Sequence, residues 1–538
     1  LAKAVRERLE GSVAETSVAP KAEVLSAARR NAAGRYDATF GGQRGAPKFP
    51  SSMPLRFLLR YARRSGDARA LAMVERTLEG MAAGGIYDQV GGGFHRYSTD
   101  ERWLVPHFEK MLYDNALLAL TYLEAWQVTG RTDFQRVVRE ILAYVTREMT
   151  SPDGAFYSAT DADSLTPTGE REEGAFFTWT PAELAEALGE RRAKLLTELY
   201  GVTAAGNFEG RNILHAARTV ADVAASRGRT AEEIRAILDT ARAELRDVRA
   251  RRPAPLRDDK ILVAWNGLMI SVFAQAGFAF DEPSLVDAAA RAAQFVVSRM
   301  RIDGRLQRVF LDGKARGPSF LEDHAFLVQG LLDLYEASAE LRWLREAVAI
   351  QAVQDRHYAD ASGGGYFETA DDGEKLLARE KPARDGAIPS GNSVAGLNLL
   401  RLAEFSGDDA YQSRFDMLYA AFEPILASGR GGLSELLLAV DYQLDATKEI
   451  VVVAPPNGGN LAAMLAPLRT AFVPNRILSV VREGDELDRA AAVVPLVEGR
   501  IASKGRVTAY VCEQRVCLRP TDDPREFAKQ LAEVKALE

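Results

Sequence analysis

Residues 113–130 read YDNALLALTYLEAWQVTG, a polar opening followed by side chains that are apolar on nearly every face of a helix. Three more segments share this form: WNGLMISVFAQAGFAF at 265–280, EDHAFLVQGLLDLYEAS at 322–338 and SGNSVAGLNLLRLAEFSG at 390–407. A helix that is apolar all round is buried on every side. Each segment is followed by a more amphipathic helix, rich in Arg and Glu, which we expect to lie outside its partner.

These segments belong to a series of helix pairs joined by short polar turns, predicted at 53–64 with 67–83, 108–129 with 133–149, 262–280 with 284–300, 320–338 with 342–357, and 392–405 with 409–426. Residues 166–252 interrupt the series and are interpreted as one more hairpin that carries an insertion. A repeated pair of buried and exposed helices is typical of a closed or stacked helical array. The sequence therefore predicts a mostly α chain whose residues 20–445 form an (α/α)6 toroid. A solenoid is the alternative on the repeats alone.

The pattern changes after residue 445, where short β-branched runs alternate with helices. We expect residues 446–538 to form a small α/β domain of order β-α-β-(α)-β-β-α, thioredoxin-like in topology. Cys512 and Cys517 fall in its predicted hairpin and not in a CxxC motif at a helix start, so we expect apolar strand residues or a local bridge without catalytic function. Residues 1–19 are interpreted as a linker or the remnant of an upstream domain.

Composition excludes several classes of protein. The formal net charge is −7, with both signs mixed along the chain, which argues against a nucleic-acid partner. No run of 18 apolar residues and no signal peptide are visible, so no membrane partner is expected. The chain has 2 Cys, which fits a reducing compartment and predicts a cytoplasmic location.

The stretch GGIYDQVGGGFHRYSTDERWLVPHFEKMLYDN at 84–115 concentrates titratable and aromatic residues and holds two of the chain's 5 His. We expect the polar openings of the inner helices to meet at one end of the barrel and line one cavity. The predicted catalytic residues are His95, His107, His324, Asp114, Asp161, Asp163 and Asp323. The predicted substrate-binding residues are Arg96, Lys110, Asp259, Trp103, Trp265, Asn266 and Asn392. For any single acid, capping of a helix is the competing interpretation.

Longer motifs carry a resemblance to a known family. They are GGQRGAPKFP at 41–50, the stretch at 84–115, YSATDADS at 157–164, EEGAFFTW at 172–179, RDDKILVAWNGLMI at 257–270, LEDHAF at 321–326 and YVCEQRVC at 510–517. In this order they resemble the spermatogenesis-associated protein 20 family, the thioredoxin-domain-containing YyaL-like proteins, over nearly the whole chain. The resemblance implies a barrel like those of six-hairpin glycosidases and N-acylglucosamine 2-epimerases. It also implies an N-terminal thioredoxin-like domain with a Cys-His-Trp-Cys motif, which this sequence lacks.

Residues and resemblance together favour a carbohydrate-active protein with a sugar as its small-molecule partner. The first hypothesis is a sugar epimerase or isomerase in which rim histidines act as acid and base, and Arg96 or Lys110 stabilises an enolate. A glycoside hydrolase is the alternative; its carboxylates would come from Asp161/Asp163, Asp258/Asp259, Glu322/Asp323, Asp114 and Asp385. A third possibility is a non-catalytic sugar- or protein-binding module of a thioredoxin-linked family. No cofactor and no metal are expected.

Overall fold

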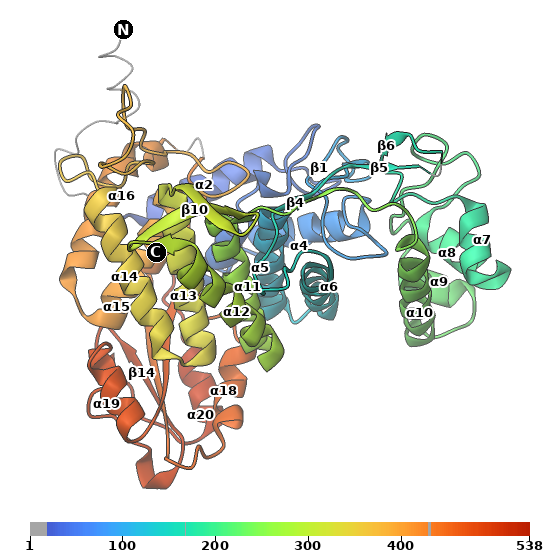
Figure 1. Cartoon of the computed structure of the whole chain (residues 1–538). Helices are drawn as coiled ribbons and strands as arrows, with labels where there is room; N and C mark the ends of the chain where they lie inside the picture. The colour runs from blue at the N-terminus through green and yellow to red at the C-terminus, as the bar shows by residue number, and fades with distance from the viewer. Residues whose placement is uncertain (1–18, 167, 429–431, 538) are drawn as a thin grey trace.

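The computed structural model describes residues 19–166, 168–428 and 432–537 (Figure 1). Residues 1–18, most of the segment interpreted as a linker or remnant, lie outside the described residues. The rest is mostly helical and has a small mixed sheet near the C-terminus.

Six helices form an inner ring. In chain order they are α3 (Leu55–Ser65), α5 (Leu112–Thr129), α11 (Val263–Phe280), α13 (Leu321–Ser338), α15 (Gly391–Ser406) and α17 (Leu436–Leu444). Each contacts the next, and α17 contacts α3, so the ring closes on itself. The backbones of α11 and α13 approach most closely at Gly267 and Gly330, where a Cβ atom would lie 2.5 Å from the other helix. A closed ring is a barrel and not a solenoid.

Six outer helices cover the ring. Five follow their inner partners directly: α4 (Ala68–Ala83), α6 (Thr132–Glu148), α12 (Pro283–Arg299), α14 (Leu341–His357) and α16 (Asp409–Ala427). The sixth is α2 (Ala22–Arg35), which contacts α16 and α17 on one side and α3 and α4 on the other. The first and last helices of the barrel thus form its sixth pair. The predicted (α/α)6 toroid is confirmed.

All six inner helices run in the same direction, because an outer helix returns the chain between successive inner ones. Their N-terminal ends therefore lie at one end of the barrel, which we call the mouth. Short strands precede or connect the helices there: β1 (Tyr97–Ser98), β2 (Pro106–His107), β3 (Lys110–Met111), β4 (Ala159–Thr160), β5 (Asp163–Leu165), β6 (Arg171–Glu173), β7 (Arg257–Asp258), β8 (Ile261–Leu262), β9 (Arg301–Ile302), β10 (Arg305–Leu311) and β11 (Lys314–Pro318). Loops carried by these strands position the side chains of the mouth.

The interruption of the helical series is a separate cluster of four helices. They are α7 (Pro181–Leu188), α8 (Glu190–Tyr200), α9 (Val220–Ser226) and α10 (Ala231–Arg249), and Figure 1 shows them projecting to one side of the barrel. Their apolar faces pack on one another around Trp179. The expectation that 166–252 supplies a barrel hairpin is therefore wrong: these amphipathic helices bury their single apolar stripes in a core of their own.

The C-terminal sheet is sandwiched between two helices and the base of the barrel. Its order is β13 (Arg476–Arg482), β12 (Lys448–Ala454), β14 (Thr508–Glu513) and β15 (Val516–Cys517), with β12 and β13 parallel and the other pairs antiparallel. Alternate β12 residues Ile450 and Val452 belong to a core with α18 (Leu461–Thr470) and α20 (Pro524–Ala532). The intervening residues of β12 join the barrel core. Figure 1 shows this domain, with α19 (Asp485–Ala491), at the end of the barrel opposite the mouth.

α11 is long and apolar enough to cross a membrane by length and composition, a feature that the sequence analysis did not expect. Of its 18-residue window, 83% is buried inside the protein. Its position in the inner ring accounts for that composition.

Candidate functional site

Three asparagines at the starts of inner helices make the same contact. The side-chain oxygen of each accepts the backbone N–H of an aromatic residue at 2.8 Å, and its amide nitrogen donates to the carbonyl of that same residue. The pairs are Asn115 with Phe94, Asn266 with Phe156, and Asn392 with Tyr366. The amides of Asn266 and Asn392, both predicted to bind substrate, are thus engaged in holding glycine–aromatic segments against the inner helices.

A second repeated contact involves Lys110, which was also predicted to bind substrate. Its buried ammonium donates to Asp88 at 2.8 Å, and the other oxygen of that carboxylate accepts two backbone amides of the glycine turn. The same arrangement recurs where Lys48 pairs with Asp37 and Lys381 with Asp360. Lys110 therefore stabilises a turn.

The three histidines have different surroundings. His95 is buried; its Nδ1 lies 2.8 Å from the Phe108 carbonyl, and burial lowers the pKa of its ring to about 3. His324 is also buried, with Nδ1 3.2 Å from the Phe320 carbonyl, and burial lowers its pKa to about 4. Both rings are neutral at pH 7. Within the described part of the chain, His324 has no hydrogen-bond or ring partner in common with His95 or His107.

His107 belongs to a partly exposed cluster. Its Nδ1 lies 2.8 Å from Glu173 and its Nε2 3.3 Å from Glu109, which also accepts from Arg96 at 2.9 Å. The structure thus brings the predicted residues His107 and Arg96 together at the β1–β2 hairpin.

Most of the other predicted acids are held by nearby donors. Asp161 pairs with Arg171 at 2.9 Å and Asp259 with Arg257 at 2.5 Å, both near the surface. Asp163 lies in β5, half-buried, and its backbone N–H donates to Asp161.

Asp323 is fully buried at the start of α13. It accepts the Ala264 N–H at 3.1 Å and Arg308 at 3.0 Å, so it ties α13 to α11. Burial nevertheless raises the pKa of its carboxyl to about 6, despite the nearby Arg308 charge.

The two predicted tryptophans differ in exposure. Trp103 is fully buried and donates its indole N–H to the Phe40 carbonyl at 3.0 Å. Trp265 is partly buried and meets the ring of Tyr113 edge-on, with centroids 4.8 Å apart. Of the two, only Trp265 presents part of its ring to solvent.

Asp114 differs from all of these acids. This residue, at the start of α5, is only 5% exposed, and its Oδ2 has no hydrogen-bond partner among the described residues. Burial holds the pKa of this carboxyl well above its usual range. Asp114 lines a cavity of about 60 Å³ at the mouth, together with Asp385 and Glu435.

The other two acids of that cavity are held in fixed orientations. Asp385 accepts from the Ser390 N–H at 2.9 Å, the Ser393 hydroxyl at 2.8 Å and the Glu435 N–H at 2.8 Å. Glu435 pairs with Arg56 at 2.9 Å. Burial raises the pKa of both carboxyls, although Arg56 opposes the shift at Glu435.

A larger cavity of about 690 Å³ adjoins the first and shares Asp385 and Ser434 with it. Its walls come from α2, the 43–54 loop, the 383–387 segment and the start of α17. They combine apolar side chains with hydroxyl, amide and guanidinium groups: Phe49, Pro54, Ile425, Leu433, Asn31, Arg35, Gln43, Ser51 and Arg384.

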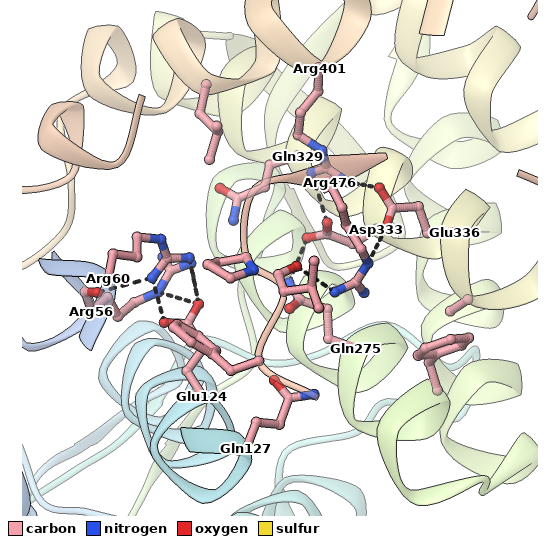
Figure 2. Close-up of a pocket in the computed structure, with 16 residues that line it drawn as sticks. Arg56, Arg60, Glu124, Gln127, Gln275, Gln329, Asp333, Glu336, Arg401 and Arg476 are labelled. Carbon is pink, nitrogen blue, oxygen red and sulfur yellow. Dashed lines mark hydrogen bonds and ion pairs between the residues drawn. The ribbon is translucent and has the colours of Figure 1, made fainter. Parts of the chain in front are cut away.

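Towards the C-terminal domain, the barrel is filled by a network of paired charges (Figure 2), which Arg56 joins to Glu435 at the mouth. Glu124 accepts from Arg56 at 2.9 Å and from Arg60 at 2.7 Å, and Arg401 pairs with Asp333 at 2.8 Å. Residues 472–474 of the C-terminal domain lie against them, and the remaining cavity is about 70 Å³. Each of these charged groups already has a partner within the described residues, and the C-terminal domain packs against them. The mouth is therefore the better candidate site.

Arg56 and Glu435 were missed in the sequence. Each is a charged residue in the first turn, or just before the start, of an apolar inner helix, which is the signal that could have identified them. Asp385 was included only among the carboxylates of the hydrolase alternative.

No protein-family model matches the chain. It is 38% identical over 531 residues to human (Homo sapiens) spermatogenesis-associated protein 20, covering 92% of this chain and 67% of that protein. The rat (Rattus norvegicus) protein of the same name is 37% identical over 564 residues, covering 98% and 71%. This similarity extends through both the barrel and the C-terminal domain.

Among solved structures, cellobiose 2-epimerase from Bacillus thermoamylovorans aligns with a TM-score of 0.46 at 9% identity, covering 74% of this chain and 86% of its own. A GH76 alpha-mannanase from Bacteroides thetaiotaomicron aligns with a TM-score of 0.44 at 9% identity, covering 78% and 96%.

Proposed function

The chain belongs to the spermatogenesis-associated protein 20 family, and from that premise we propose that it acts on a carbohydrate at the mouth of its barrel. The proposed reaction is hydrolysis of a glycosidic bond, with Asp114 as general acid and Asp385 as the second carboxylate. A sugar epimerase or isomerase based on His107 is the alternative.

The observation that carries the proposal is the burial of the Asp114 carboxyl, which raises its pKa. A general acid must hold its proton near neutral pH, and burial in an apolar site is how proteins raise the pKa of a carboxyl. The raised pKa of Asp114 fits that role, and among the residues that the structure describes its Oδ2 has no hydrogen-bond partner. A carboxyl retained only to stabilise the fold would be expected to have hydrogen-bond partners.

Asp385 is suited to the complementary role, because the hydrogen bonds that it accepts oppose the effect of burial on its pKa and favour its ionised form. Two backbone amides and a serine hydroxyl hold its carboxylate in one orientation on the wall shared by the two cavities. Glycoside hydrolysis uses a second carboxylate either as a nucleophile or as the base that activates water. A carboxylate fixed by donors is preorganised for either task.

The larger cavity supports a sugar as the ligand. Its volume of about 690 Å³ falls within the range of about 300–1,000 Å³ typical of small-molecule sites. A sugar ring presents apolar C–H faces and polar hydroxyl edges. The walls offer both kinds of contact, from Phe49 and Pro54 on one hand and from Gln43 and Arg35 on the other.

The epimerase alternative rests on His107. Its Nδ1 lies 2.8 Å from Glu173 and its Nε2 3.3 Å from Glu109, and Arg96 lies in the same cluster. The predicted histidine partners His95 and His324 are buried and neutral, with Nδ1 directed at a backbone carbonyl. That environment favours the carboxylate mechanism over one based on two histidines.

The test is turnover of a panel of aryl glycosides and free disaccharides by the wild-type chain and three variants. Asp114→Asn should abolish release of the aglycone, whereas His107→Ala and the outer-helix control Asp133→Asn should stay within about threefold of wild type, because they leave the carboxyl pair intact. Loss of sugar isomerisation in His107→Ala with full activity in Asp114→Asn would instead support the epimerase alternative.

A further inference from the structure

We propose that Cys512 and Cys517 form a redox-active dithiol–disulfide pair, a reactive centre in the C-terminal domain separate from the mouth of the barrel. The two residues are opposite one another in the β14–β15 hairpin and are joined by a disulfide. This inference does not depend on the proposed sugar chemistry. It goes beyond the sequence expectation of a non-catalytic pair, because it uses groups that lie near the sulfurs only in the folded chain.

The first of these groups is Arg500. One guanidinium nitrogen lies 3.0 Å from Cys517 Sγ and 3.7 Å from Cys512 Sγ. Arg500 also donates to the Leu496 carbonyl at 3.2 Å and lies over the Tyr510 ring. Within the described part of the chain it forms no ion pair with a carboxylate. A neutral disulfide gains little from a nearby cation, whereas a thiolate gains a charge-assisted hydrogen bond. Arg500 is therefore placed to stabilise the reduced form.

The second group is a pair of carboxyls. Glu449 lies opposite Cys512 across the β12–β14 ladder, so the two side chains share one face of the sheet. Its Oε1 accepts the Arg515 N–H of the hairpin turn at 3.0 Å. Burial and the charge of Glu449 raise the pKa of the neighbouring Glu404 to about 7. The Glu404–Glu449 pair therefore meets the disulfide through Glu449, which faces Cys512 across the ladder and can pass a proton to its thiolate.

Access to the pair comes from one side. Cys512 is fully buried, whereas Cys517 is partly exposed. An incoming thiol can therefore reach Cys517 Sγ but not Cys512 Sγ.

The exchange proceeds in two steps with a dithiol reductant. A thiolate of the reductant attacks Cys517 Sγ, the S–S bond breaks, and Cys512 leaves with the electron pair and takes a proton from the nearby carboxyl pair. The second thiolate of the reductant then attacks its own sulfur in the mixed disulfide and releases Cys517 as a thiolate facing Arg500. The reductant becomes a disulfide and loses two electrons and two protons. The chain gains the two electrons, one proton returns to the carboxyl pair, and the other goes to solvent or to Cys517.

The test uses the full chain and dithiothreitol as the probe. Native protein equilibrated in mixtures of reduced and oxidised dithiothreitol should yield two alkylated thiols, detected by mass spectrometry, and oxidised dithiothreitol should restore the disulfide. Release of no thiol from the folded chain, under conditions that reduce the pair after unfolding in guanidinium, would overturn the proposal.

A second measurement isolates the charge of Arg500. In pre-reduced protein at pH 6 to 7, Arg500→Gln should lower the rate of alkylation of Cys517 by iodoacetamide about tenfold, the effect of losing one pKa unit of thiolate stabilisation. Arg500→Lys keeps the charge and should restore most of that rate. Arg506→Gln removes an arginine of the same domain that pairs with Asp522, and it should leave the rate unchanged. Equal rates in Arg500→Gln and wild type would refute the assigned role of this residue.

Discussion

Replacing Asp114 by Asn should stabilise the fold at neutral pH while abolishing turnover. The pKa of this carboxyl is raised in the folded state, so between its unfolded pKa near 4 and its folded pKa the folded chain keeps a proton that the unfolded chain loses. The free energy of unfolding of the wild type consequently falls by about 1.4 kcal/mol for each pH unit in that window. Asn has nearly the same shape and does not titrate, so the free energy of unfolding of the variant does not show this fall with pH.

The assay is urea unfolding of wild type and Asp114→Asn at a series of pH values from 4 to 6. If Asp114 stays protonated throughout, the stability of the variant relative to wild type should rise by about 2.4 kcal/mol between pH 4 and 6, because the unfolded carboxyl is still about half protonated at pH 4. Other groups titrate in both proteins and largely cancel in the difference. The matched control is Asp385→Asn, which should destabilise at every pH because its carboxylate accepts three hydrogen bonds between 2.8 and 2.9 Å.

The reasoning would be refuted if the stability difference between wild type and Asp114→Asn stayed flat across this range. A flat difference means that Asp114 titrates alike in the folded and unfolded states. A destabilised variant with full turnover would show that the carboxyl supports the fold and has no part in chemistry, which removes the basis for its role as general acid.

Three further predictions concern the barrel and its rim. Asn266→Ala should lower the free energy of unfolding, measured by thermal unfolding, by about 3 kcal/mol or more, because three hydrogen bonds are lost and the backbone of Phe156 is left unpaired. A loss below about 1 kcal/mol would contradict the proposal that these asparagines hold the glycine–aromatic segments. The pKa of Glu124 is lowered to about 2 from an ordinary 4.5. The stability that it contributes, about 3 kcal/mol, is therefore present above pH 4.5 and is lost as the pH falls towards 2. Glu124→Gln should be less stable than wild type at pH 7, and its free energy of unfolding should fall less in acid. His107→Ala should change stability by less than about 1 kcal/mol, since its ion pairs are partly exposed; a larger loss in urea unfolding would show that the rim cluster supports the fold.

Much of the helical part of the fold could be predicted from the sequence. Long helices that are apolar all round, such as 113–130 and 265–280, can only be buried, and their amphipathic partners can only lie outside. The sixth pair could not be found in this way. It joins α2 to α17, which are some 400 residues apart in the sequence. A local sequence pattern cannot predict this contact, because it forms only when the ring closes. The insertion was assigned to the barrel for the same reason: its helices have the right period, but their apolar stripes face each other.

The site was harder to predict because one sequence pattern serves two purposes. The polar residues that open the inner helices include Asn266 and Asn392, which hold glycine–aromatic segments. They also include Asp114, whose Oδ2 has no hydrogen-bond partner in the described parts of the chain. Residue type and spacing are alike in the two cases, and only the contacts distinguish them. The position of Arg500 next to two sulfurs is likewise a property of the folded hairpin.

Binding of a sugar at the mouth is the most direct test of the central claim. The measurement is the thermal unfolding midpoint with and without each member of a panel of mono- and disaccharides, for wild type and for Ser434→Trp, which places a large side chain at the boundary of the two cavities. A ligand at about 100 times its Kd stabilises the folded state by about 2.7 kcal/mol. We expect at least one sugar to raise the midpoint of wild type by several degrees and to leave that of Ser434→Trp unchanged. An equal rise in both proteins, or no rise with any sugar, would contradict the assignment of the mouth as a carbohydrate site.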